Sequence, residues 1–187
     1  MVETLAAAAT GIALAASAGL RAFLPLFAAG SAARWFHWPI ASSMSWLTSD
    51  VALVMFGLAS VVEILADKVP AVDHVLDLLQ TVLSPVAGAI AALAALQGWP
   101  APFALALAII VGAPLAGGFH AIGALTRVQS SASTAGAANP ALSVIEDVIA
   151  ATMVILAFVI PLALVIAIFW FGIRWIRRRR AGRMAAA

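Results

Sequence analysis

The sequence predicts an all-α polytopic membrane protein, a helical bundle of about five spans with broken or kinked helices. Three observations predict this fold class. Hydrophobic residues make up 65% of the 187 residues and charged residues only 10%, whereas a soluble domain carries about 25% charged residues. The apolar residues form long runs without the period-two alternation of a barrel strand. The last run leads into four consecutive arginines at residues 177–180, which is typical of a cytoplasmic flank.

The first two apolar runs, residues 5–29 and 51–66, are the first two expected spans. Only Arg21 and Pro25 interrupt the first run, and Glu63 lies inside the second. The run that follows the initiator Met lacks a basic n-region and is too long for a signal-peptide core. We therefore expect it to be retained as a span.

Three further runs complete the expected bundle. Residues 82–96 are short for a full crossing, so the sequence leaves open whether this segment spans or re-enters. Residues 103–126 carry His120 in their second half. Residues 142–173 form the longest run, where we expect Pro161 to kink the helix. The whole chain, residues 1–187, is then one transmembrane domain with a basic tail at residues 174–187.

The flanking residues predict an orientation. Residues 31–49 contain three tryptophans and Arg34, and tryptophan favours the membrane boundary. With the arginine tail inside and five crossings, the N-terminus lies outside. We expect a bacterial inner (plasma) membrane protein with a cytoplasmic C-terminus. The net charge of +2 reflects the basic tail, which predicts contact with anionic lipid rather than with nucleic acid.

Two weak patterns concern helix packing. Residues 19–23 resemble residues 118–122, and if the two spans cross in opposite senses this leaves open an inverted-topology repeat. Small residues also recur four apart, which lets helices approach closely or form a dimer face: Gly11, Ala15, Gly19, Ala113, Gly117 and Ala121. We expect tight bundle packing, and a homo-oligomer for the assembled protein.

Charged and titratable residues at lipid depth are costly, and proteins retain them mainly at functional sites. Arg21, Glu63 and His120 lie inside apolar sequence, and Glu146 begins the last run. We expect these four residues to line a substrate or ion pathway. In the expected spans Glu63 lies toward the outer side and Arg21 toward the inner side, which argues against a direct pair.

A second group of candidates follows the second run. Asp67, Asp73, His74 and Asp77 bring carboxylate and imidazole ligands close together in sequence. These ligands suit a hard or borderline divalent cation. Apart from such a cation, the sequence predicts no cofactor. The chain has no cysteine, which excludes disulfides, thiolate metal ligands and cysteine nucleophiles.

Residues 17–25 and 63–73, together with Ser143, Glu146 and Asp147, resemble an uncharacterised bacterial membrane family, domain of unknown function 4126. The resemblance implies a multi-pass architecture and no activity. From the residues, the leading hypothesis is a small transporter or channel for a small solute or ion. A non-transporting scaffold or lipid-binding subunit is the alternative, and a metal-dependent lipid-modifying enzyme is the weaker one. We expect no catalytic residues and no enzyme activity.

Overall fold

The computed structural model describes residues 2–184, without side chains for residues 2, 70–71, 73–74, 164–165, 168–169, 171–173 and 175–184. All regular elements in this range are helical, as predicted. They are α1 (Val2–Leu20), α2 (Leu24–Trp35), the 3-10 helix η1 (Ser42–Thr48), α3 (Asp50–Ala66), α4 (Pro70–Ala95), α5 (Ala101–Leu107), the π-helix η2 (Ala108–Gly112), α6 (Ala113–Thr134) and α7 (Asn139–Met184).

The predicted first span is two helices. The chain leaves the helical conformation after Leu20 and re-enters it at Leu24, where Pro25 occupies the first turn of α2. After α2, Trp38 lies beside Thr10 of α1 in the lining of one cavity. The chain has therefore turned back, and α1 and α2 form a hairpin, called here the α1–α2 hairpin.

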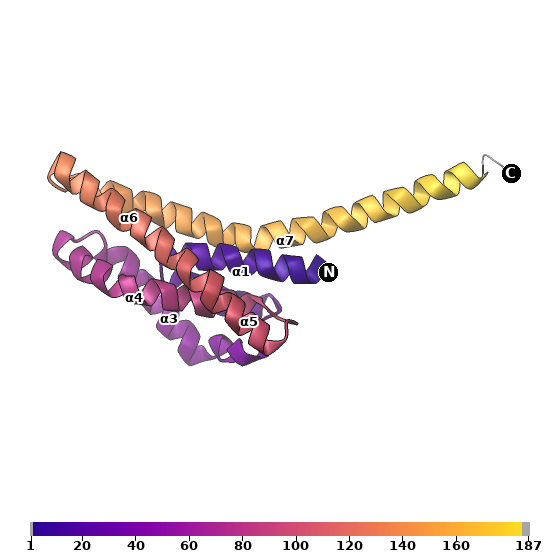
Figure 1. Ribbon diagram of the computed structural model, residues 1–187, viewed down its shortest axis with the longest axis horizontal. Coiled ribbons are helices and arrows are strands. Elements are labelled where there is room, and N and C mark those ends of the chain that lie inside the picture. Colours follow the sequence, from indigo (N-terminus) through magenta and orange to yellow (C-terminus); the bar gives the residue numbers. More distant parts are fainter. Residues whose placement is uncertain (1, 185–187) are drawn as a thin grey trace.

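The α1 and α7 helices run antiparallel. Thr10 Oγ1 donates to the Ala157 carbonyl at 2.9 Å, and Ser17 Oγ donates to the Ala150 carbonyl at 3.1 Å. The N-terminal end of α1 and the second half of α7 therefore lie at the same end of the bundle (Figure 1). This differs from the predicted topology, which placed the two termini on opposite sides because it treated the hairpin as one crossing.

Four helices are long and apolar enough to cross a membrane, or five if the bent pair η1 and α3, with its 69° angle, counts as one span. The predicted third segment, residues 82–96, is the second half of the longer helix α4. The polar residues before it belong to the first turns of that helix rather than to a connection. In the fourth segment, a π-turn precedes Pro114, because proline cannot donate the hydrogen bond that continues the helix.

The α1 and α6 helices run in the same direction. Ala8 and Ile12 line one apolar cavity with Leu107 and Val111, and further along both helices Gly19 meets Ala116. The similar residues 19–23 and 118–122 are therefore not related by opposite crossing senses, and this pair does not support an inverted repeat.

Small residues let the interior helices touch. A Cβ on Gly19 would lie 2.4 Å from the Ala116 carbonyl oxygen, and one on Gly11 would lie 3.1 Å from the Ala92 carbonyl oxygen. Ala15 is fully buried. On α1 the four-residue spacing thus serves packing inside the bundle.

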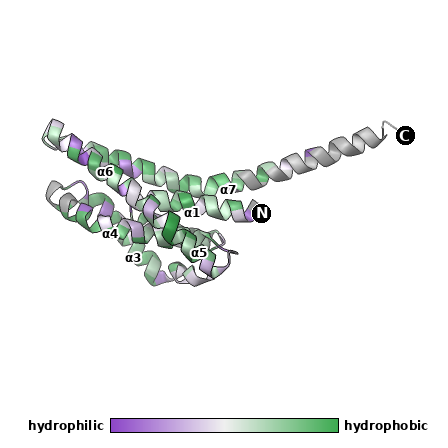
Figure 2. Cartoon of the chain, in the orientation of Figure 1, coloured by the Kyte–Doolittle hydropathy of each residue, from purple (hydrophilic) through white to green (hydrophobic). Residues whose placement is uncertain are grey.

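The helices are hydrophobic along much of their length (Figure 2), and many large apolar side chains are exposed on the bundle. Examples on α3, α4 and α7 are Leu58, Leu65, Leu78, Val82, Val148 and Ile155, each at least 53% exposed. Exposure of such an apolar surface to water is unfavourable, whereas its contact with lipid chains is favourable. The chain is a membrane protein.

Candidate functional site

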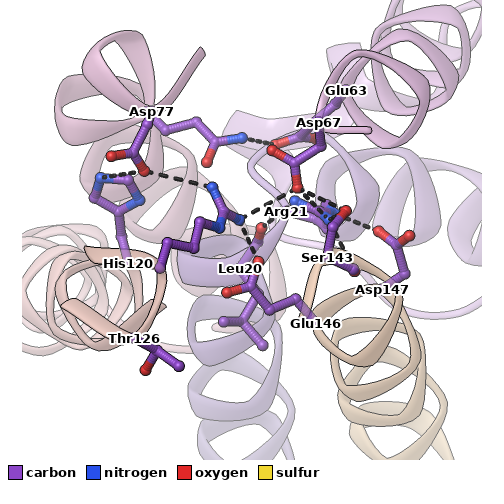
Figure 3. Close-up of polar contacts among 12 residues, drawn as sticks. Leu20, Arg21, Glu63, Asp67, Asp77, His120, Thr126, Ser143, Glu146 and Asp147 are labelled. Carbon is purple, nitrogen blue, oxygen red and sulfur yellow. Dashed lines mark hydrogen bonds and ion pairs between the residues drawn. The ribbon is translucent and has the colours of Figure 1, made fainter. Parts of the chain in front are cut away.

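Nine titratable side chains meet where the α1–α2 hairpin turns, and we call them the ionic cluster. They come from the hairpin turn, the end of α3 and the turn after it, α4, α6 and the start of α7 (Figure 3). The members are Arg21, Glu63, Asp67, Lys68, Asp77, His120, Arg127, Glu146 and Asp147.

Arg21 is completely buried at the centre of the cluster. Its Nη2 lies 2.6 Å from Asp67 Oδ2, and its Nε donates to Asp147 Oδ1 at 2.6 Å. The remaining donors reach the carbonyls of Leu20 and Ser143 at 3.2 Å each. All three guanidinium nitrogens therefore have an acceptor, which offsets much of the cost of removing the charge from water.

Glu63, 1% exposed, binds the backbone of the hairpin turn. Its Oε1 accepts from the Ala22 amide at 2.7 Å, and its Oε2 accepts from the Phe23 amide at 3.3 Å. These N–H groups precede α2 and have no helical partner, so a carboxylate is well placed to satisfy them. Gln80 of α4 also donates to Glu63 Oε1 at 2.7 Å. Glu63 thereby ties α3 to the hairpin turn and to α4.

Arg127 of α6 bridges three carboxylates. Its Nη2 lies 3.2 Å from Asp67 Oδ2 and pairs closely with Glu146, and its Nη1 lies 3.6 Å from Asp77. Asp67 Oδ2 also accepts from Ser143 Oγ at 3.0 Å. Asp67 is thus shared between Arg21 and Arg127, which joins α6 to α1 and α7.

The outer edge of the cluster is less shielded. His120 Nε2 lies 3.9 Å from Asp77 Oδ1 and 3.3 Å from Thr81 Oγ1. Lys68 donates to Asp147 Oδ2 at 2.7 Å, and its side chain is 33% exposed. Lys68 and Asp77, each about one third exposed, are therefore the most accessible members of the cluster.

The cluster holds five carboxylates, three basic side chains and one histidine. Fully ionised, it carries more negative than positive charge, which favours uptake of protons or cations. Its members lie in α3, α4, α6 and α7 and in the turns that follow α1 and α3. A relative movement of these helices must therefore break or exchange ion pairs.

The family model for a domain of unknown function, DUF4126, matches residues 8–178. The chain belongs to the DUF4126 family. This match confirms the resemblance seen in the sequence, and every residue of the ionic cluster lies within the DUF4126 domain. Neither the curated proteins nor the solved structures that were searched contain a significant match.

The structure brings all four predicted pathway residues of the DUF4126 domain into one cluster: Arg21, Glu63, His120 and Glu146. As expected, Arg21 and Glu63 do not form a direct pair, since Arg21 pairs with Asp67 and Asp147. The premise that they lie at different depths was wrong, because the hairpin places Arg21 at the end of α1, beside the end of α3. The amide that Glu63 binds belongs to Ala22, the next residue after Arg21.

The predicted metal ligands are only partly described. Asp67 and Asp77 are engaged by Arg127, and Asp73 and His74 lie outside the described side chains. Among the side chains that are described, no three histidine or carboxylate groups are arranged to hold a metal ion. The divalent-cation site stays a prediction.

Sequence reasoning did not assign five residues of the site in this DUF4126 protein: Lys68, Gln80, Arg127, Ser143 and Asp147. Lys68 and Arg127 lie just beyond the ends of the expected spans 51–66 and 103–126. A usable signal was present, because Arg127 still lies within helical sequence and matches the excess of acidic residues on the same side. Pairing between helices cannot be read from a single sequence.

A line of polar residues leads from the cluster along α1. Glu3, Thr10, Ser17 and Arg21 are seven, seven and four residues apart, so they share one helix face. Thr10, Ser17 and Arg21 contact α7. We call this contact the α1–α7 seam. It joins the cluster to a cavity at the opposite end of the domain.

Proposed function

We propose that this DUF4126 protein is a small membrane transporter or channel for a small solute or ion, with the ionic cluster as its gate. The observation that carries the proposal is the completely buried Arg21 among Asp67 and Asp147 inside a bundle with an apolar exterior. Charges at such a position are retained mainly where a pathway or a bound substrate needs them.

The path runs from the cavity beside Thr10, along the α1–α7 seam, to the cluster and its edge at His120 and Asp77. The conformation described is a closed one, because Arg21 has no exposed surface. Opening requires the α1–α2 hairpin to move relative to α7. Broken helices at an ion site are a recurring device of transporters, and the break after Leu20 supplies one.

A scaffold or lipid-binding role without transport is the second candidate. It is favoured by the saturation of Arg21, since each of its nitrogens already has an acceptor. The same contacts that close a gate also hold a static bundle together. A transporter must break and re-form the ion pairs of Arg21 during its cycle, whereas a scaffold keeps these pairs fixed.

A flux screen separates these functions. Purified protein in liposomes is assayed for movement of protons, alkali cations, small organic cations and small organic anions, with Glu63→Gln beside the wild type. Transport predicts flux for at least one class and its loss in Glu63→Gln, while Arg34→Gln, a change in a surface pair, keeps it. If the wild type moves none of these solutes, and Glu63→Gln only lowers stability, the result supports the scaffold.

The location and assembly belong to the same proposal. We assign the protein to the bacterial inner membrane, with the end that carries Trp35, Trp46 and the second half of α7 in the cytoplasm. Arg34 at that end and the arginines of the tail support this side, and the tail suits anionic lipid. A homo-oligomer remains part of the proposal, to be tested by mass measurement in mild detergent and by crosslinking in native membrane.

A further inference from the structure

A cavity of about 170 Å³ lies at the end of the bundle opposite the ionic cluster. We call it the α1–α7 cavity. Its polar lining residues are Glu3, Thr10, Trp38 and Gln97, and the others are Ala6, Ala7, Pro39, Ala95, Pro161 and Leu162. Thr10 is eleven residues from Arg21, about 16 Å along the helix, so this cavity is separate from the cluster.

Among the described residues, the cavity lining includes one carboxylate and no basic side chain. Glu3 is the only ionisable side chain among the described residues that line the cavity. It is exposed, so its carboxylate stays in contact with water. The Glu3 carboxylate attracts a cation, and Thr10 and Gln97, which also line the cavity, offer side-chain oxygens as further acceptors.

An indole adds a second feature that attracts cations. The Trp38 ring is held edge-on against Phe158, with 5.2 Å between ring centroids, so it is positioned before a ligand arrives. Tryptophan is the best partner for cation–π attraction. A carboxylate and an indole in a mostly apolar cavity match an alkylated ammonium group, whose charge is spread over apolar methyl or methylene groups. A strongly hydrated metal cation needs more oxygen ligands than these residues offer.

We propose that the α1–α7 cavity binds a small alkylammonium group through Glu3, Trp38 and Gln97. Two sources supply this chemistry, a free organic cation and the headgroup of an aminophospholipid. If the cation is also carried, the cavity is the cytoplasmic entrance to the seam. That last role rests on the proposed function, whereas the binding site does not.

The test is a calorimetric titration of choline into the full chain in nanodiscs of phosphatidylglycerol. The neutral isostere 3,3-dimethyl-1-butanol is titrated in parallel. Choline should bind and the alcohol should not. Glu3→Gln should weaken choline binding about three- to fivefold, and Trp38→Leu about five- to thirtyfold.

Asp50→Asn is the matched control, because Asp50 is an exposed carboxylate at the same end whose partner is Arg34, and it is absent from the cavity lining. Equal heats for choline and the alcohol, no choline binding by the wild type, or equal weakening by Asp50→Asn and Glu3→Gln would each overturn the site. Because Glu3 is exposed, we expect Glu3→Gln to fold. If Trp38→Leu does not fold, Glu3→Gln still tests the site.

Two further experiments distinguish a lipid headgroup from a free cation as the ligand, and binding alone from transport. Nanodiscs that contain phosphatidylethanolamine should suppress choline binding if the lipid headgroup is the natural ligand, and leave it unchanged if a free cation is. Choline binding without choline flux in proteoliposomes keeps the site but removes its role as an entrance. Flux of another ion without choline binding supports the proposed function and overturns the site.

Discussion

Thr10 donates its hydroxyl hydrogen to the carbonyl oxygen of Ala157 at 2.9 Å. This carbonyl is the one that Pro161, four residues later and inside α7, leaves without its helical donor. Lipid offers no substitute donor, so a neighbouring side chain must supply one. The proline in α7 and the threonine in α1 therefore act as one unit.

This pairing predicts a non-additive mutant cycle. Thr10→Val keeps the side-chain shape and should lower the free energy of unfolding by about 1–2 kcal/mol, because the Ala157 carbonyl loses its donor. In a Pro161→Ala background residue 161 regains its N–H group, and the cost of Thr10→Val should fall by about 1 kcal/mol. Unfolding in mixed micelles measures both. Equal costs in the two backgrounds would contradict the pairing.

Removing the buried cation should be severe. Arg21→Gln leaves Asp67 and Asp147 without their central partner and should destabilise the protein by about 3–5 kcal/mol. Arg34→Gln removes an arginine whose side chain is 42% exposed and should change stability by less than about 1 kcal/mol. Thermal melts of the two variants in one detergent make the comparison. Similar losses of stability in the two variants would show that burial does not strengthen the contribution of the Arg21 ion pairs.

Glu63→Gln separates structure from gating. The amide oxygen can still accept from the Ala22 N–H group, so the hairpin should form, with a loss of about 1–2 kcal/mol. The side chain can no longer take up or release a proton, so under the proposed function flux and its dependence on pH should disappear. Melting curves and liposome flux are measured on the same preparation. Normal flux with normal pH dependence would remove Glu63 from the gate.

Two glycines offer a matched test of helix packing. Gly19→Ala places a methyl group 2.4 Å from the Ala116 carbonyl oxygen and should cost about 1–3 kcal/mol. Gly118→Ala adds the same group where no atom lies within 4 Å, so stability should be unchanged or rise by up to about 1 kcal/mol, because alanine favours a helix over glycine. Equal effects in an unfolding assay would mean that α1 and α6 do not approach as described.

The hairpin also makes the topology testable, and the chain has no native cysteine. Single cysteines in Glu3→Cys and Arg174→Cys should react with an impermeant maleimide from the same side of the membrane. Ser131→Cys, in the last turns of α6, should react from the opposite side. Labelling of positions 3 and 174 from opposite sides would restore the odd number of crossings that the sequence predicted.

The sequence predicted the fold class, the kinked helices and the four pathway candidates because each rests on local apolar runs and their interruptions. The error in the first span has a physical cause. Hydropathy does not distinguish a straight helix through Arg21 and Pro25 from two helices that turn there, since both bury the same residues. The turn depends on Glu63, whose approach to the Ala22 and Phe23 amides is a long-range contact.

The cluster was predictable in part for a related reason. Charges inside apolar sequence stand out individually, so Arg21 and Glu63 were found. Their partners depend on which helices are neighbours. Arg127 and Lys68 lie near the ends of the expected spans, where basic residues are common. Only the packed bundle shows that both pair with buried or half-buried carboxylates.

The position of Arg21 also constrains how the protein is made. Arg21 is synthesised early, and Asp67 follows just after α3. Asp147 comes 126 residues after Arg21 in the chain. Until α7 enters the membrane, Arg21 has only part of its final set of acceptors. A nascent chain that stops after α6 therefore carries an incompletely neutralised charge at the hairpin, so the bundle reaches its full stability only when α7 packs against α1.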